Sequence, residues 1–240
     1  MIRTATFAAA ALAASACHFG ANAEERDPGS SVSRTYQVGA FDKIEVAGPY
    51  DVSVATGGAP SANATGGDKL LDETEVVVED GTLKIRAKKK NGMRWNWGKK
   101  GKAQFTVTTA MLHNAGIAGS GRITVDKIDG DFKGDVAGSG DLRLAAVNGG
   151  TVELSIAGSG KITAAGKSAA TKIDIAGSGD VDTGGLAAKT AEVSIAGSGN
   201  VQAQASDSAN VEIAGSGNVK VTGGAKCSVS KAGVGNVTCG

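Results

Sequence analysis

The sequence contains few aromatic residues, few prolines and few of the side chains that hold metal ions. Aromatic residues make up 4% of its 240 residues, and there are three prolines, three cysteines and two histidines. Only His113 lies beyond the N-terminal leader described below, which excludes a zinc site built from several histidines. No stretch approaches the run of about 18 apolar residues that a membrane-spanning helix needs. We therefore predict no integral membrane span.

Neither sign of charge dominates the chain. Lysine plus arginine amount to 25 residues and aspartate plus glutamate to 24. This balance argues against a nucleic-acid partner. The chain is instead rich in glycine, with 37 residues, and in valine, isoleucine, alanine, serine and threonine. Such a composition is typical of β-strands joined by many tight turns.

A four-residue turn sequence, AGSG, recurs through the second half of the chain. It occurs seven times, the last copy reading AGVG, at steps of 19, 20, 19, 20, 18 and 18 residues. A period near 20 residues indicates a solenoid. A phosphate-binding loop is excluded because no G-K-[ST] ending and no helix follow. The copies begin at Ala118, Ala137, Ala157, Ala176, Ala196, Ala214 and Ala232.

The side chains beside each turn predict β-strands. Around the third copy, Val152, Leu154 and Ile156 alternate with polar residues, which is the period of a half-buried strand. Aliphatic residues recur before and after every turn, as expected if equivalent strands of successive coils pair in parallel. We predict an all-β parallel β-helix with coils of about 18–20 residues, in which the glycine pairs form the corners.

The residue after each glycine pair forms a second, polar series. Charges of opposite sign alternate at first, and asparagines follow. On neighbouring coils these side chains would be direct neighbours, so we expect ion pairs and an amide ladder that fix the register. The series is Arg122, Asp141, Lys161, Asp180, Asn200, Asn218 and Asn236.

The N-terminus has the features of a secretory signal peptide. Arg3 precedes an alanine-rich apolar run, and the tripeptide Ala-Asn-Ala at residues 21–23 forms an A-x-A cleavage pattern. We predict a signal peptide over residues 1–23 and a polar linker over residues 24–35. A cut before Cys17, which would leave a lipid anchor there, is the less favoured alternative.

Cleavage after residue 23 leaves two cysteines, Cys227 and Cys239, in a compartment that permits disulfides. They flank the last glycine turn, and counting by twos along the strands directs both inward. An even pair in an exported chain favours a bridge over a catalytic thiol. We predict a disulfide between them.

Residues 36–110 have weaker repeats, and residues 111–240 carry the regular AGSG coils. The segments FDKIEVAGPYDVSVATG, LLDETEVVVEDGTLKIRA and AQFTVTTAMLHNAGIAGSGRITV, in this order before the AGSGD copies, resemble the bacterial auto-transporter adhesin head domain, or head GIN domain, family. The resemblance covers residues 36–240. It implies a single-stranded right-handed β-helix, export to the periplasm, outer membrane or cell surface, and an adhesive role. It supplies no catalytic residues.

Residues 84–102, KIRAKKKNGMRWNWGKKGK, are the strongest local anomaly. They hold nine lysines or arginines, no acid and both tryptophans. Basic residues interleaved with aromatics can hold anionic polymers, so the expected partner is an anionic polysaccharide, lipopolysaccharide or another envelope component. The alternative is a solvated loop whose tryptophans pack on the solenoid. The candidate ligand-binding residues are Lys88, Lys89, Lys90, Arg94, Trp95, Trp97, Lys99 and Lys100.

The carboxylates offer only a weak case for catalysis. Asp126, Asp129 and Asp131 cluster near one corner with two lysines, but exposed corners collect such residues without function. We predict an exported, non-enzymatic, adhesin-like protein with no catalytic residue, metal site or cofactor. The alternatives are a structural envelope protein capable of self-association and, less favoured, a polysaccharide-active enzyme.

Overall fold

The computed structural model describes residues 27–88 and 102–240. In these ranges the chain forms 19 strands, all in one sheet, and one short helix. The elements are β1 (Ser31–Tyr36), β2 (Lys43–Ala47), β3 (Asp51–Thr56), β4 (Ser61–Gly67), α1 (Asp68–Asp72), β5 (Thr74–Glu79), β6 (Thr82–Ala87), β7 (Gln104–Thr109), β8 (Asn114–Gly119), β9 (Arg122–Val125), β10 (Ile128–Asp129), β11 (Phe132–Gly138), β12 (Asp141–Asn148), β13 (Thr151–Gly158), β14 (Lys161–Gly177), β15 (Asp180–Gly197), β16 (Asn200–Gly215), β17 (Asn218–Thr222), β18 (Lys226–Gly233) and β19 (Asn236–Cys239).

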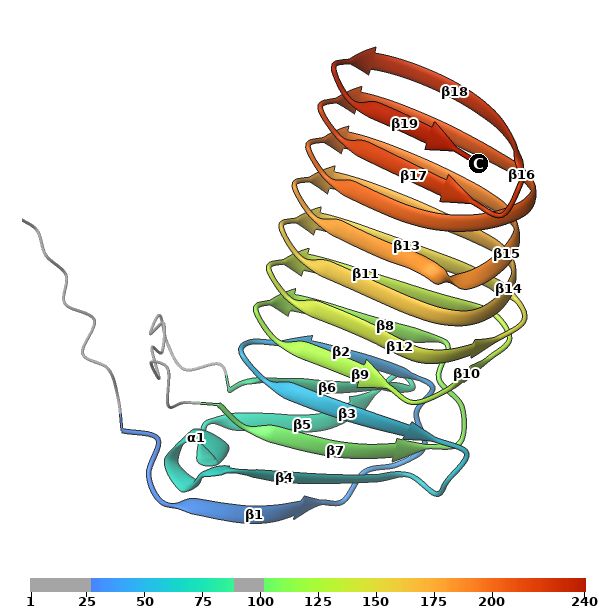
Figure 1. The fold of residues 1–240 in the computed structure, drawn as a ribbon. Helices are drawn as coiled ribbons and strands as arrows, with labels where there is room; N and C mark the ends of the chain where they lie inside the picture. The colour runs from blue at the N-terminus through green and yellow to red at the C-terminus, as the bar shows by residue number, and fades with distance from the viewer. Residues whose placement is uncertain (1–26, 89–101) are drawn as a thin grey trace, which may run out of the picture.

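Most of these strands stack as the coils of a β-solenoid (Figure 1). The pairing is parallel, and residues one repeat apart lie opposite one another. Val136 of β11 faces Ile156 of β13, which faces Ile175 of β14, which in turn faces Ile195 of β15. The parallel β-helix predicted from the repeat is confirmed.

Two columns of aliphatic side chains fill the interior. Their members in the inner coils are at most 3% exposed. Burying each contributes about 1.5–3 kcal/mol to folding before the entropy cost of ordering the chain is subtracted. One column is Ile117, Val136, Ile156, Ile175, Ile195 and Ile213, and the other is Ile123, Leu142, Ile162, Val181, Val201 and Val219.

The two glycines of each AGSG corner are required for different reasons. Gly177 has a φ of +131°, a conformation that residues with a Cβ rarely adopt. Gly179 does not have a positive φ, but a Cβ there would lie 2.6 Å from Ile156 Cγ2 and 2.9 Å from Gly160 O of the preceding coil. The first glycine therefore allows the bend and the second allows the coils to approach.

The polar series beside the corners makes part of the expected ladder, with contacts toward both ends and, among the described residues, no ion pair at Lys161 in the middle. Arg122 pairs with Asp141 at 3.0 Å. Further along the stack, the Asn200 side-chain amide donates to Asp180 Oδ1 at 2.9 Å, and that of Asn218 donates to Asn200 Oδ1 at 3.0 Å. These contacts are exposed, so they fix register more than they add stability.

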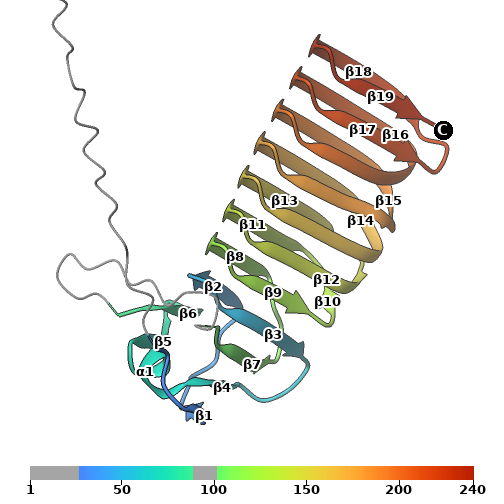
Figure 2. The same ribbon diagram turned by 60° about the vertical axis from the view of Figure 1, so that its left-hand side comes forward.

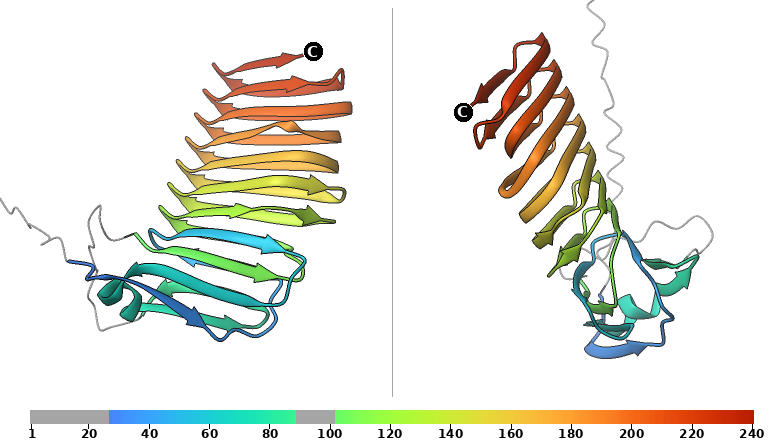
Figure 3. Two further views of the ribbon diagram at one scale, coloured as in Figure 1. Left: turned by 60° about the horizontal axis from the view of Figure 1, so that its bottom comes forward. Right: turned by 90° about the vertical axis from the view of Figure 1, so that its right-hand side faces the viewer.

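The N-terminal end departs from the regular coil (Figure 3). β4 pairs antiparallel with β1 and with β7, and β5 and β6 form an antiparallel hairpin. Residues 31–35, which the sequence suggested as linker, thus belong to the sheet. Three aromatic rings lie close together in this region. The ring centroid of Phe105 is 5.6 Å from that of Tyr50, in an edge-on contact, and 6.4 Å from that of Tyr36.

The first coils do not stack in sequence order (Figure 2). β2 lies between β6 and β8, and β3 lies between β7 and β9. The β2–β3 coil comes first in the chain but second in this part of the stack. The connection from β7 to β8 runs past the β2–β3 coil. Two hydrogen bonds attach it to the residues just before β2, from Thr109 Oγ1 to Phe41 O and from His113 N to Asp42 O.

The last coil carries the predicted disulfide between Cys227 and Cys239, whose Cα atoms lie 6.6 Å apart. Cys227 is half-buried and Cys239 is exposed, because no described coil covers them from above. Lys231 stands opposite Ile213, where the inner coils have an aliphatic residue, and its Nζ donates to Gly235 O at 2.8 Å.

Candidate functional site

One coil has a long insertion in place of its tight corner. Between β8 and β9 the corner takes two residues, and between β2 and β3 it takes three. The equivalent strands of the coil below, β6 and β7, are separated by residues 88–103. This insertion holds all the ligand-binding candidates predicted from the sequence. Long segments in a compact repeat are more often functional than short turns are.

The structure describes only one of these candidates. Lys88 Nζ donates to Asp72 O at 2.6 Å, which ties the start of the insertion to the end of α1. The other seven candidates lie outside the described residues, namely Lys89, Lys90, Arg94, Trp95, Trp97, Lys99 and Lys100.

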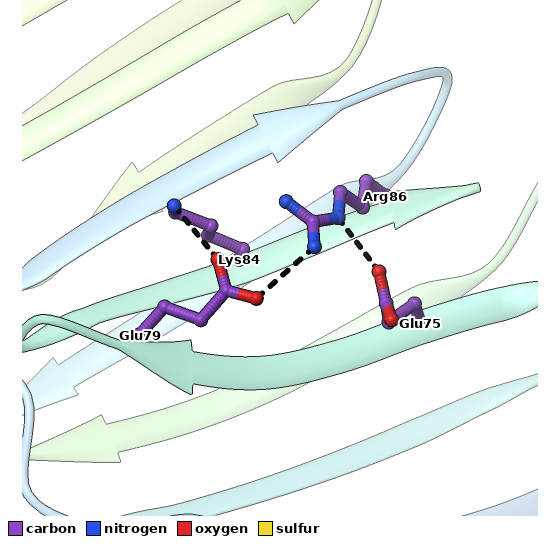
Figure 4. A network of polar contacts seen from close by, with 4 residues as sticks. All are labelled: Glu75, Glu79, Lys84 and Arg86. Atoms are coloured by element: carbon purple, nitrogen blue, oxygen red, sulfur yellow. Dashed lines mark hydrogen bonds and ion pairs between the residues drawn. The ribbon is translucent and has the colours of Figure 1, made fainter. Parts of the chain in front are cut away.

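The strand that leads into the insertion is held by a network of ion pairs (Figure 4). On the β5–β6 hairpin, Lys84 Nζ lies 2.9 Å from Glu79 Oε2, and Arg86 contacts Glu75 at 2.7 Å and Glu79 at 3.2 Å. The hydrogen bond from Lys84, followed by its charge, lowers the pKa of Glu79. Two of the nine basic residues in the stretch are thus neutralised within the hairpin, so the charge available to a ligand lies beyond them.

We expect replacement of Lys84 with methionine to raise the pKa of Glu79 toward its ordinary value of about 4.3. The pKa is lowered in the folded protein, so the ion pair contributes stability above the ordinary pKa and loses it as the pH falls. Titration of the Glu79 carboxyl by NMR measures the shift. Lys220→Met, on the distant strand β17, serves as the control, and an equal pKa of Glu79 in both variants would show that Lys84 is not its main partner.

The aspartates considered for catalysis instead support the backbone and the ladder. Asp126 Oδ1 accepts from Thr56 N at 3.0 Å, and Asp131 Oδ1 accepts from Thr151 N at 2.6 Å. Asp129 lies 2.7 Å from Lys127, whose hydrogen bond is the main reason that the pKa of Asp129 is lowered. A carboxyl that stays ionised cannot donate a proton as a general acid.

Within residues 27–88 and 102–240, no three histidine, cysteine or acidic side chains lie close enough together to hold a metal ion. His113 points its Nδ1 at Asp131 O, 3.3 Å away. In the same ranges no helix is long and apolar enough to cross a membrane.

A groove that no sequence motif indicated lies on the side of the solenoid opposite the AGSG corners. It lies where β14, β15 and β16 bend, has a volume of about 500 Å³ and is lined by two lysines, Lys167 and Lys189. The only signal available in the sequence is the variation in coil length between 18 and 20 residues.

Comparison with known proteins places the fold among bacterial adhesin-like proteins. Residues 40–225 match the family described as putative auto-transporter adhesin, head GIN domain. No curated protein matches the chain.

Several solved structures share the fold. A putative adhesin from Bacteroides fragilis is 22% identical, with a TM-score of 0.78, covering 88% of this chain and 97% of its own. A putative lipid binding protein from Parabacteroides distasonis is 25% identical, with a TM-score of 0.71 and the same coverage. A putative adhesin from Parabacteroides merdae is 18% identical, with a TM-score of 0.66, covering 88% of this chain and 96% of its own.

Proposed function

Because the chain belongs to the putative auto-transporter adhesin, head GIN domain family, we propose that it is an exported, non-enzymatic binding module. It contacts a surface, matrix or glycan at the periplasm, outer membrane or cell surface of a bacterium. The family is named for adhesion and not for an enzyme activity.

The observation that carries this proposal is the insertion of residues 88–103. The AGSG corners take two residues each and the β2–β3 corner takes three, whereas the equivalent connection between β6 and β7 has sixteen residues. The basic residues and both tryptophans of the insertion form the only stretch of the sequence with this composition. Such a segment on a rigid stack suits an anionic polymer.

The disulfide supports export, because such bonds persist in oxidising compartments. The predicted signal peptide at residues 1–23 and the alternative lipid anchor at Cys17 lie outside the described residues and stay predictions.

We propose an anionic polysaccharide or lipopolysaccharide as the ligand. Both present carboxylates or phosphates to lysine and arginine. The description of the Parabacteroides distasonis relative as a putative lipid binding protein is in keeping with a negatively charged headgroup as the contacted feature.

We expect the mature protein, residues 24–240, to bind anionic polymers on an array of envelope and host glycans that includes lipopolysaccharide. Replacing Lys99 and Lys100 with alanine should weaken binding about tenfold or more, since charge-assisted contacts are lost. Binding should also weaken as salt increases. Replacing Trp95 and Trp97 with alanine tests the contribution of stacking separately.

The matched control is Lys43→Ala with Lys220→Ala, which removes the same charge from exposed strand positions. Binding that falls equally in both charge variants would reflect general electrostatics and not the insertion. Failure to bind any polymer at low salt would overturn the proposal.

The second candidate function is a structural, self-assembling envelope protein. It is favoured by Val229 and Val234 of the last coil, which are 47% and 86% exposed. Sedimentation of the mature protein over a range of concentrations would reveal assembly, and a monomer at all concentrations would exclude this alternative.

A further inference from the structure

The groove at the bend of β14, β15 and β16 lies away from the AGSG corners, whereas the end of β6, where the insertion begins, lies on the corner side. The bend is at the right of Figure 1, beside the labels β15 and β16. Its lining extends from Asn148 at the end of β12 to Gly223 just after β17. These residues belong to five successive coils, so the groove runs along the stack for about 19 Å at about 4.8 Å a step.

The groove arises because neighbouring coils differ in length at this bend. Thr183 of β15 lies opposite Ala203 of β16, and Ala191 of β15 lies opposite Ala209 of β16. Seven residues lie between these two positions in β15, but only five lie between them in β16. The pairing shifts at two points in between. Extra residues of this kind form bulges, which are frequent beside functional sites.

Two lysines on adjacent coils line this depression. Lys167 of β14 lies opposite Ala187 of β15. Lys189 of β15 follows Ala188, which lies opposite Ser168, and so comes level with Ala169. The two lysines therefore lie on neighbouring coils beside four alanines, of which Ala169 and Ala187 are exposed and the other two are buried.

Neither lysine has a carboxylate partner among the described residues, in contrast to two other lysines of the solenoid. Lys127 pairs with Asp129 at 2.7 Å, and Lys172 lies 3.8 Å from Glu153. None of the residues that line the groove is acidic. The nearest acid along the chain, Asp207, accepts a hydrogen bond from the Ser206 hydroxyl. The lining itself carries the charges of two lysines and no carboxylate, and Asp207 stands next to it in the chain.

The other lining groups indicate what kind of anion fits. Gln204 supplies an amide, and the Ser206 hydroxyl, which donates to Asp207, can still accept a hydrogen bond, so both suit the hydroxyl groups of a sugar. No aromatic residue lines the groove, so it offers no platform for nucleic-acid bases. An elongated groove with spaced cations, amide and hydroxyl groups and alanines in its lining matches a linear chain that carries both carboxylates and hydroxyls.

We propose that this groove is a binding site for a linear acidic oligosaccharide, with carboxylates of the sugar held by Lys167 and Lys189. The inference rests on the proposed function for its ligand class, but it assigns a second site that is independent of the insertion. Two separate sites on one rigid stack would let the protein hold two polymer chains, or one chain at two places.

Calorimetric titration of the mature protein with tetragalacturonate at low salt tests the site, with maltotetraose as the uncharged probe of equal length. We expect the acidic tetramer to bind and the neutral one not to. Lys167→Gln with Lys189→Gln should weaken binding at least tenfold. Lys43→Gln with Lys220→Gln, which removes the same charge elsewhere, should leave binding within twofold.

A second variant, Ala187→Tyr, keeps both lysines and fills the groove at an exposed alanine. It should also weaken binding at least tenfold, whereas a groove that is not the site would leave it unchanged. Tetragalacturonate binding that is lost only with Lys99→Ala and Lys100→Ala would overturn the groove and support the insertion. No binding of tetragalacturonate by the unaltered protein would overturn the groove, while the array result would still decide the proposed function.

Discussion

Replacing Gly177 with valine is expected to lower the free energy of unfolding by about 4 kcal/mol. Its φ of +131° is unfavourable for a β-branched residue, and its Cβ would overlap Gly158 O of the preceding coil. Gly177 also lies opposite Gly197 of the next coil. Strain at this corner therefore affects the packing of the coil on both neighbours.

Urea denaturation followed by circular dichroism measures this loss, and two variants separate its causes. Gly149 also has a positive φ, +79°, but a Cβ there would meet no atom within 4 Å. Gly149→Val should therefore cost only about 1–3 kcal/mol, from backbone strain alone. Ala176→Val changes an exposed strand residue and should stay within about 0.5 kcal/mol of the unaltered protein. Equal stability of Gly177→Val and Ala176→Val would contradict the corner geometry.

The regular coils were predictable because each one repeats the same short sequence pattern. The aliphatic residue before the turn, the glycine pair and the aliphatic residue after it recur at nearly constant spacing, so one alignment of the copies also gives the register. The pairing of Val136 with Ile156 and of Leu142 with Ile162 follows from that alignment. The polar ladder was predictable for the same reason.

The N-terminal stack was not predictable in this way. The sequence of β2 and β3 indicates strands, but nothing in it states that β6 and β7 will lie on one side of them and β8 and β9 on the other. Pairing between strands that are not consecutive leaves no local period. The antiparallel pairing of β1 with β4 was not predictable either, because residues 24–35 are polar and resemble a linker. Such a segment becomes a strand only because a partner strand is available.

Of the two candidate sites, the sequence indicates one and not the other. The insertion is visible in the sequence because its composition is unusual, although its place at a corner requires the pairing of β6 with β2. The groove has ordinary composition. It forms where coils of unequal length are stacked. Lys167 and Lys189 share no motif in the sequence, and the stacking places them on neighbouring coils of one groove.

Removing the disulfide is expected to destabilise the last coil by about 3 kcal/mol in the chain-entropy model. Cys227 lies opposite Ala209 and Cys239 lies opposite Val221, so both cysteines stand on the outermost described coil. That coil packs on one neighbour and has Lys231 in place of an aliphatic residue. The bridge joins β18 to β19 across it and compensates for the weaker packing.

Cys227→Ser with Cys239→Ser should therefore speed amide hydrogen exchange in β18 and β19 while leaving β11 to β15 nearly unchanged, because coils of a solenoid can open locally. Ser228→Ala, beside the bridge and exposed, is the matched control and should exchange as the unaltered protein does. Intact mass after alkylation without reductant checks the premise. Two alkylated thiols in protein from the export compartment would refute the bridge, and uniform acceleration across all coils would show that the whole stack opens as one unit.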